Sequence, residues 1–247
     1  MTHERMRAHY QTLLAPIYRW MLGDFSLAVG RSRAELASFD IGGAPAGARA
    51  LDLGAGLGLQ TIPLVELGYA VTAVDSSEAL LGELTAACPA AQAIVGDMLD
   101  DRFFSPDTYD VIVCMGDTLT HLSSHEEVDA LLAKSVAALR HGGTLAITFR
   151  DYVSTVREST DANILVRSDE HRIHTCCLRH GREHVRVTDL VHERGERGWT
   201  LRASAYDKLR LAHEWVAERL RDHGASARGW SEAGRVCVVA HRADGDA

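Results

Sequence analysis

The 247-residue chain contains little cysteine, almost no lysine and no long hydrophobic run. Its five cysteines are an odd number without a Cys-x-x-Cys pair, which is typical of a reducing, cytoplasmic compartment. No apolar run approaches 18 residues, and the segment from Met1 to Arg5 is polar, so we expect neither secretion nor a membrane span. Only Lys134 and Lys208 are lysines, and arginine carries nearly all of the positive charge.

The formal net charge of −8 disfavours a nucleic-acid-binding surface, because phosphate contacts need clustered basic residues. The acidity is uneven. Residues 48–149 hold 4 basic and 14 acidic groups, whereas residues 150–211 hold 12 and 10. The second segment is therefore suited to a small anionic or carboxylated ligand. We expect a small-molecule substrate, no nucleic-acid or membrane partner, and either a monomer or a homodimer.

From residue 48 onward, short apolar strands alternate with helical patterns, which predicts a parallel, doubly wound sheet. The predicted strands are 48–53, 70–75, 93–95, 109–115 and 144–149, with a last strand at 235–241. Helices are predicted at 59–67, after a capping box Asp75-x-x-Glu78, and after a second one, Ser124-x-x-Glu127. The expected fold class is α/β, a Rossmann-like, seven-stranded, mostly parallel sheet.

The segments on either side of this pattern predict two additions to the sheet. Residues 4–40 have the spacing of two helices. Stretches near 171–179, 184–192 and 199–206 are rich in β-branched residues and predict an antiparallel meander, and a helix follows near 212–223. We therefore expect an N-terminal helical cap (1–42), a core (43–150 and 212–247) and an antiparallel β insert after strand 5 (151–211) that forms a lid.

The most informative motif follows the first predicted strand, at the position of the ligand crevice in doubly wound folds. Asp52 precedes three glycines, Gly54, Gly56 and Gly58, which allow backbone to approach a ligand closely. A dinucleotide fingerprint requires a glycine where this chain has Leu59. The spacing therefore disfavours an NAD-dependent dehydrogenase.

Acidic residues also end the second and third predicted strands. Asp75 is suited to accept two hydrogen bonds from a ribose diol. Asp97 can accept from an exocyclic adenine amine, and Met98 can pack on the ring. Because the carboxyl ends of parallel strands meet at one edge, these residues predict a single adenosine site.

With these motifs the chain resembles the class I S-adenosylmethionine-dependent methyltransferases. The resemblance implies S-adenosylmethionine as cofactor and S-adenosylhomocysteine as product. The glycines would line the methionine moiety, and Asp52 would either orient the loop or meet the cofactor's amino group. The predicted cofactor site also includes the neighbouring residues Ala55, Ser76 and Met115. Tyr18, with Tyr10 and Trp20, either caps the cofactor or belongs to an apolar helix face.

A narrower resemblance comes from Cys114–Leu122 and from Phe149-Arg150-Asp151-Tyr152, which are similar to segments of glycine and sarcosine N-methyltransferases. Asn163–Asp169 extends the likeness. It implies that Arg150 binds a substrate carboxylate, and that Arg31 or Arg33 binds the carboxylate of the cofactor. Two departures matter: Asp117 replaces an amide of the family, and Leu165-Val166 replaces tyrosines. We therefore expect an acceptor other than glycine, with a cationic or hydroxyl group near Asp117.

Methyl transfer benefits from a general base, and His121 is the first candidate because its ordinary pKa lies near neutrality. Asp117, Asp151 and Tyr152 are the alternatives, and Arg150 is a candidate anion clamp. No metal site is expected, because the adjacent Cys176 and Cys177 on a strand point to opposite faces. The residues thus favour a small-molecule methyltransferase, with nitrogen preferred over oxygen as acceptor. An RNA or protein methyltransferase and a non-catalytic cofactor-binding regulator are the alternatives.

Overall fold

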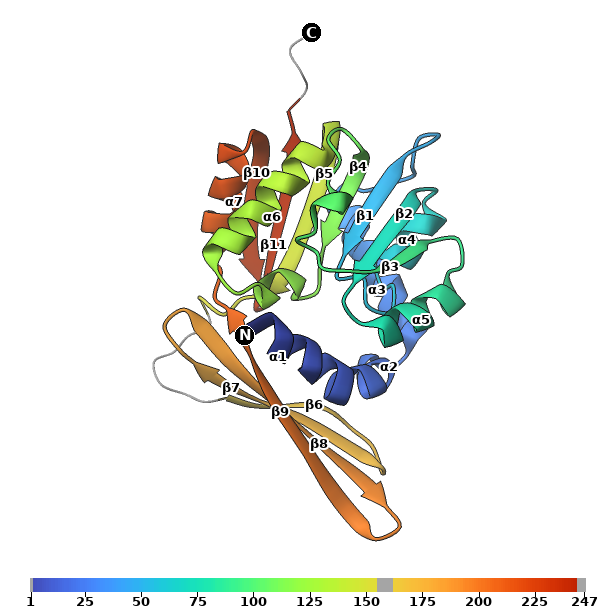
Figure 1. Cartoon of the computed structure of the whole chain (residues 1–247), viewed down its shortest axis with the longest axis vertical. Coiled ribbons are helices and arrows are strands. Elements are labelled where there is room, and N and C mark those ends of the chain that lie inside the picture. Colours follow the sequence, from blue (N-terminus) through green and yellow to red (C-terminus); the bar gives the residue numbers. More distant parts are fainter. Residues whose placement is uncertain (1, 155–161, 244–247) are drawn as a thin grey trace.

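The computed structural model describes residues 2–154 and 162–243, which form two β-sheets with helices around the larger one (Figure 1). The larger sheet and its helices form the upper body of the molecule. The smaller sheet projects below it, and a helical run from the N-terminus lies between the two. Within the described ranges, no helix is both long and apolar enough to cross a lipid bilayer.

The larger sheet has seven strands in the order β10-β11-β5-β4-β1-β2-β3. The strands are β1 (Arg49–Leu53), β2 (Ala70–Asp75), β3 (Gln92–Val95), β4 (Tyr109–Cys114), β5 (Leu139–Arg150), β10 (Ala225–Glu232) and β11 (Arg235–Arg242). β1 to β5 pair in parallel, and β11 runs antiparallel to both of its neighbours. The predicted Rossmann-like, seven-stranded, mostly parallel sheet is confirmed.

Apolar side chains cover both faces of this sheet, as expected where strands alternate with helices. On one face, Leu51 and Leu53 of β1 share a core with α6 (His125–Ala138) and α7 (His213–Asp222). On the other face, Ala50 packs with residues of α3 (Phe25–Ser38) and α4 (Thr61–Glu66). Alternate residues of one strand therefore belong to different cores, which fixes the register of the strand.

The two predicted capping boxes have different outcomes. Ser124 caps α6 as predicted, because its hydroxyl accepts a hydrogen bond from Glu127 N. The prediction for Asp75 is wrong: the N-cap of α5 (Glu78–Ala87) is Ser77, which accepts from Leu80 N. Asp75 is the last residue of β2, and its carboxylate instead accepts from Ser77 N and Gly56 N. The carboxylate of Asp75 thus belongs to the edge of the sheet.

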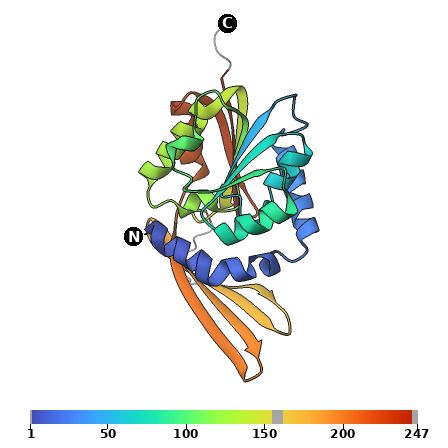
Figure 2. The same cartoon turned by 45° about the vertical axis from the view of Figure 1, so that its right-hand side comes forward.

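The N-terminal helical run, residues 2–22, crosses the lower edge of the larger sheet (Figure 2). It consists of α1 (Thr2–His9), a π-helical turn η1 (Tyr10–Leu14), a 3₁₀ turn η2 (Ala15–Ile17) and α2 (Tyr18–Leu22). α3 then follows from Asp24, whose side chain caps it. The sequence predicts two helices here, and the first of them is this interrupted run.

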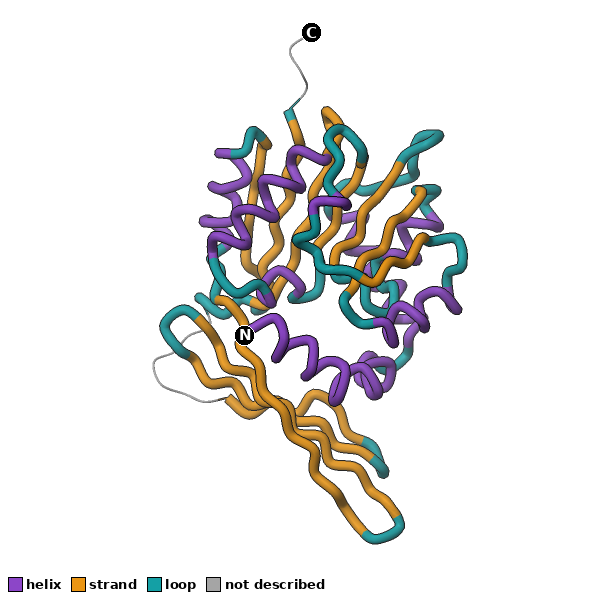
Figure 3. The backbone as a smooth tube through the Cα atoms, viewed as in Figure 1, coloured by secondary structure: helices purple, strands orange, loops and turns teal. Residues whose placement is uncertain are grey.

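The smaller sheet, called here the insert sheet, consists of β6 (Ala162–Ser168), β7 (Arg172–His180), β8 (His184–Gly195) and β9 (Gly198–Leu209). All neighbours are antiparallel (Figure 3). β7, β8 and β9 confirm the predicted meander. The pattern does not identify β6, because its residues are mostly exposed and its register shifts between Leu165 and Arg167.

We expect Gly58→Ala to destabilise the fold by about 2 kcal/mol, since Gly58 has a φ of +89° and a Cβ there would overlap Leu84 Cδ1. Leu84 is fully buried, so its side chain cannot move out into solvent. The matched control is Gly82→Ala on α5, where nothing lies within 4 Å of the added carbon. Alanine there should be neutral or stabilising by up to about 1 kcal/mol. Urea unfolding of both variants measures the difference, and equal stabilities would contradict the expectation.

Candidate functional site

The glycine-rich turn from β1 into α4 is held against the end of β2 by main-chain hydrogen bonds. Gly54 N and Ala55 N both donate to Val74 O, at 2.8 and 3.0 Å. Gly56 N donates to the Asp75 carboxylate at 2.8 Å. A side chain at Gly54 would overlap Thr118, and its φ of +75° also favours glycine. The motif therefore provides a narrow turn whose backbone faces open space.

That open space is a pocket of about 920 Å³, counting its mouth, at the carboxyl edge of the parallel strands. Ten of the predicted site residues line it: Tyr18, Gly54, Ala55, Gly56, Asp75, Ser76, Asp97, Met98, Met115 and His121. The wall is completed by residues that include Met6, Arg7, Tyr10, Leu57, Gln60, Leu80, Gly116 and Thr118. Residues from four strand ends and from the N-terminal helical run thus enclose one site.

Asp75 and Asp97 lie at the pocket with different partners. Burial raises the pKa of Asp75, in spite of the backbone N–H groups that its carboxylate accepts. Gly56 N donates to Oδ2 and Ser77 N to Oδ1, each at 2.8 Å, and a carboxylate oxygen can accept more than one hydrogen bond. Asp97 Oδ1 accepts from Leu99 N, and its Oδ2 lies 2.7 Å from Arg7 Nη2 on α1. The guanidinium of Arg7, from the N-terminal helical run, therefore pairs with Asp97, the carboxylate predicted to bind adenine.

Asp52 and Gly58 lie outside the pocket lining. Asp52 is buried and accepts a hydrogen bond of 2.6 Å from the hydroxyl of Thr61, the first residue of α4. Burial raises the pKa of Asp52 to about 7. Of the two roles predicted for Asp52, its position supports orientation of the loop. Gly58 provides close packing on Leu84.

The prediction that Arg31 or Arg33 reaches the cofactor is not supported by their positions. Both are exposed on α3, on either side of the buried Ser32. Arg33 forms an ion pair with Glu66 at the end of α4. Neither Arg31 nor Arg33 is among the residues that line the pocket. Arg7 is the arginine that lines the pocket.

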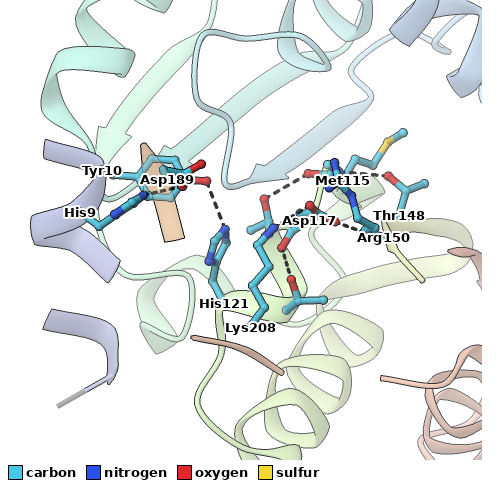
Figure 4. A network of polar contacts seen from close by, with 12 residues as sticks. His9, Tyr10, Met115, Asp117, His121, Thr148, Arg150, Asp189 and Lys208 are labelled. Atoms are coloured by element: carbon cyan, nitrogen blue, oxygen red, sulfur yellow. Dashed lines mark hydrogen bonds and ion pairs between the residues drawn. The ribbon is translucent and has the colours of Figure 1, made fainter. Parts of the chain in front are cut away.

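His121 and Tyr10 meet at the wall of the pocket (Figure 4). Tyr10 Oη is 3.2 Å from His121 Nε2, and His121 is 7% exposed. Burial raises the pKa of Tyr10 well above its ordinary value, so the phenol keeps its proton, and its oxygen can either accept a hydrogen bond from Nε2 or donate one to it. Tyr206 of β9 packs beside this pair, with its ring 5.4 Å from that of His121. One imidazole is thus held between the two sheets and the N-terminal helical run.

Asp117 lies beside the pocket and is paired with Lys208 of β9. Lys208 Nζ is 2.6 Å from Asp117 Oδ2, and Arg150 N donates to the other oxygen (Figure 4). Burial raises the pKa of Asp117, but the charge of Lys208 and its hydrogen bond outweigh this and hold that pKa well below its usual range. The side chain of Lys208 is only 6% exposed, so the pair is largely removed from water.

This ion pair changes the interpretation of the departure at Asp117. We expected an anion in place of the family's amide to attract a cationic group of the acceptor. The structure shows instead that Lys208 neutralises the carboxylate within the chain. Asp117 therefore provides no uncompensated negative charge.

Asp151 and Tyr152 do not line the pocket. The buried Asp151 accepts from the backbone of Val153 and Ser154 and from the hydroxyls of Ser154 and Ser231. Burial raises the pKa of Asp151, whereas these bonds lower it to about 2 overall. Tyr152 is 2% exposed in the core of the insert sheet. Of the predicted bases, only His121 lines the pocket, and Asp117 is next to it.

Sequence reasoning missed Arg7, Tyr206 and Lys208. Arg7 lies in a polar stretch without regularly spaced apolar residues, so nothing in the sequence indicates that it lines the pocket. Lys208 and Tyr206 are in phase on β9, and both are buried. A lysine at an inward-facing position of a strand is rare unless it pairs with an opposite charge. That pattern is the sequence signal that points to Lys208.

The segment that contributes most of the pocket lining is similar to known proteins. Residues 50–143 match the family model of a methyltransferase domain. The matched segment runs from β1 into β5 and contains the glycine-rich turn, Asp75, Asp97 and His121. The chain has a class I methyltransferase domain. The resemblance predicted from the glycine motif is thus confirmed.

The chain also matches a curated enzyme over part of its length. Over 108 residues it is 30% identical to the glycine/sarcosine N-methyltransferase of Aphanothece halophytica, which covers 42% of this chain and 41% of that protein. The chain therefore spans about two fifths of the length of that relative.

Solved structures share the fold over nearly the whole chain. The CcbJ methyltransferase from Streptomyces caelestis has a TM-score of 0.76 at 19% identity, covering 96% of this chain and 98% of that one. An amino pentose methyltransferase from Micromonospora echinaspora has a TM-score of 0.74 at 18% identity, covering 92% and 95%. At such low sequence identities, the likeness shows a shared fold only. It extends over the methyltransferase domain and its two additions.

We expect Lys208→Met to destabilise the chain by about 3 kcal/mol at pH 7, because it leaves the Asp117 carboxylate buried without its cation. The double variant Asp117→Asn, Lys208→Met should recover most of this loss. The folded-state pKa of Asp117 is depressed, so the pair's stabilisation is full above about pH 4 and declines below it. The gap between wild type and Lys208→Met should therefore narrow as the pH falls.

Chemical denaturation from about pH 2 to about pH 7 measures these differences. The control is Asp207→Asn in the same sheet, whose carboxylate lies 3.4 Å from the exposed Arg186. Its loss should stay below about 1 kcal/mol. A Lys208→Met variant as stable as this control would contradict a buried, coupled pair.

Proposed function

We propose that the chain transfers a methyl group from S-adenosylmethionine to a small-molecule acceptor and releases S-adenosylhomocysteine. The observation that carries this proposal is the convergence, in one pocket, of the glycine-rich turn, Asp75 and Asp97-Met98. Each of these groups suits a different part of the cofactor. The family match over residues 50–143 supports the same reading.

The residues of the pocket fit the cofactor's three parts. Asp75 has acceptor capacity left on both oxygens, which suits the two hydroxyls of a ribose. Asp97 and Met98 would hold the adenine by a hydrogen bond and by packing. The backbone of Gly54 and Gly56 would lie along the methionine part, for which the turn leaves space.

When bound, the cofactor supplies an activated methyl group, and the chain's own task is to place the acceptor and to remove its proton. The acceptor's lone pair forms the new bond to carbon as the carbon–sulfur bond breaks. His121 is the proposed general base, because among the described residues it is the imidazole that lines the pocket. Tyr10 holds its ring in place, and the N-terminal helical run excludes water from the site.

We propose nitrogen as the accepting atom, with oxygen as the alternative. Similarity to a glycine/sarcosine N-methyltransferase and the fold shared with an amino pentose methyltransferase support nitrogen. Arg150 is the proposed partner of an acceptor carboxylate, because it ends β5 beside Asp117. A carboxylate-bearing metabolite or natural-product intermediate fits this charge. Tyr206, buried beside Tyr10 and His121, is a further candidate for contact with the acceptor.

An RNA or protein methyltransferase is the weaker alternative, given the acidic core segment. A binding regulator without activity would bind the cofactor and release no S-adenosylhomocysteine. We also propose a cytoplasmic location, on the basis of five unpaired cysteines. The division into cap (1–42), core and insert (151–211) remains part of this proposal, although residues 155–161 lie outside the described residues.

We expect Asp75→Ala to weaken S-adenosylmethionine binding at least tenfold, because it removes the two acceptor oxygens at the ribose position and the partner of Gly56 N. Isothermal titration calorimetry measures the dissociation constant. The control is Arg33→Ala, which should leave affinity unchanged because Arg33 pairs with Glu66. Wild-type protein that does not bind, or equal affinity of Asp75→Ala and wild type, would overturn the cofactor assignment.

We expect His121→Gln to reduce turnover about a hundredfold with little change in cofactor affinity, since a general base acts on the proton of the acceptor. Release of S-adenosylhomocysteine from a pool of primary and secondary amines with carboxylates measures turnover. The acidic limb of the pH profile should disappear with the imidazole. If the limb persists in the variant, His121 is not the base.

A further inference from the structure

A buried cluster that the proposed chemistry does not use joins the N-terminal helical run to the insert sheet. His9, the last residue of α1, places Nε2 3.0 Å from Asp189 Oδ2 on β8. His174 on β7 places its Nε2 2.7 Å from the other oxygen of the same carboxylate. The three residues are 1%, 4% and 1% exposed in the order His9, Asp189 and His174.

The geometry determines which groups donate. Burial raises the pKa of Asp189, but hydrogen bonds from His174 and His9 outweigh it and lower that pKa to about 2. The carboxylate is therefore ionised and accepts on both oxygens, and each imidazole must carry a proton on Nε2. Among the described residues, the Nδ1 atoms of both rings are buried without a hydrogen-bond partner. All of the polar bonding of His9 to the insert thus depends on Asp189.

This anchor is next to the pocket in sequence and in space. Tyr10 follows His9 directly and contacts His121 at 3.2 Å. Arg7, two residues earlier, contacts Asp97 at 2.7 Å. The ring of His9 also packs on Tyr206, with centroids 4.4 Å apart (Figure 4 shows His9, Asp189, Tyr10 and His121 together). One helical segment therefore contacts the adenine position, the candidate base and the insert sheet.

We propose that Asp189, fixed by His174, is a positioning residue that anchors His9 and thereby holds Arg7 and Tyr10 closed over the pocket. The inference rests on the proposed function for its effect on ligand affinity, but not for its effect on the helical run. Without the carboxylate, His9 loses the hydrogen bond that fixes its ring. Residues 2–22 then keep the polar contacts of Thr12 O with Arg202 and of Trp20 Nε1 with Asp169. They lose the one beside Arg7 and Tyr10, and the pocket opens on that side.

The test is Asp189→Asn in the full chain. An amide accepts from one imidazole only, and its NH₂ group faces the N–H of the other. We expect faster hydrogen exchange in residues 2–22 without ligand, unchanged exchange in β1, β4 and β5, and a tenfold weaker affinity for S-adenosylhomocysteine. Asp207→Asn, a carboxylate of the same sheet that pairs with Arg186, should match wild type in both measurements.

A second pair of variants separates positioning from bulk packing. His174→Gln keeps an N–H donor for Asp189 and should restore nearly wild-type exchange and affinity, whereas His174→Leu should behave like Asp189→Asn. The proposal is overturned if Asp189→Asn matches Asp207→Asn, or if exchange rises equally in residues 2–22 and in the core strands. Wild-type protein that does not bind S-adenosylhomocysteine would overturn the proposed function. The ligand-free exchange experiment would still decide the role of the anchor.

Discussion

The close approach of the β1–α4 turn to the end of β2 is the contact on which the rest of the pocket depends. Val74 O accepts two main-chain N–H groups from that turn, and Asp75 accepts a third. These bonds form only because glycine permits the backbone angles at Gly54 and Gly56. The turn leaves its backbone facing the space that Asp75, Asp97 and His121 also reach, so main-chain geometry and the Asp75 carboxylate together set the floor of the site.

Two carboxylates, one buried (Asp189) and one partly buried (Asp117), then attach the surrounding layers to this floor. Asp117 follows β4 and is neutralised by a lysine of the insert sheet. Asp189 belongs to the insert sheet and is bonded by a histidine of the N-terminal helical run. Each carboxylate loses much of its hydration in the fold, and each recovers that loss only when a particular partner is in place. Such pairs contribute little to net stability. Their larger effect is to favour one arrangement of the docked layers over others held by apolar contacts alone.

Periodicity and strand–helix alternation predict the larger sheet well, because its strands are buried on both faces and its helices have regular apolar stripes. β6 and β10 are not predicted, because buried and exposed residues do not alternate regularly along them. At the site, strand-end acidic residues are predictable because topology brings them to one edge. The positions of Arg7 and Lys208 are not predictable, because they depend on how the N-terminal helical run and the insert sheet dock on the larger sheet. Asp189 is an intermediate case: it is in phase with Val185, Val187 and Val191, and a charge in an apolar phase signals a buried partner.

The scarcity of lysine gives the docked insert a chemical signature. Of the two lysine side chains, that of Lys134 is 31% exposed and forms an ion pair with Asp101 at the surface. That of Lys208, on β9 of the insert sheet, is 6% exposed and pairs with Asp117 of the core. An amine-reactive acylating reagent therefore meets Lys208 only in molecules whose insert sheet has separated from the core. The rate of acylation at that one position, followed by mass spectrometry, reports how readily the insert opens, and no residue has to be substituted to place the reporter.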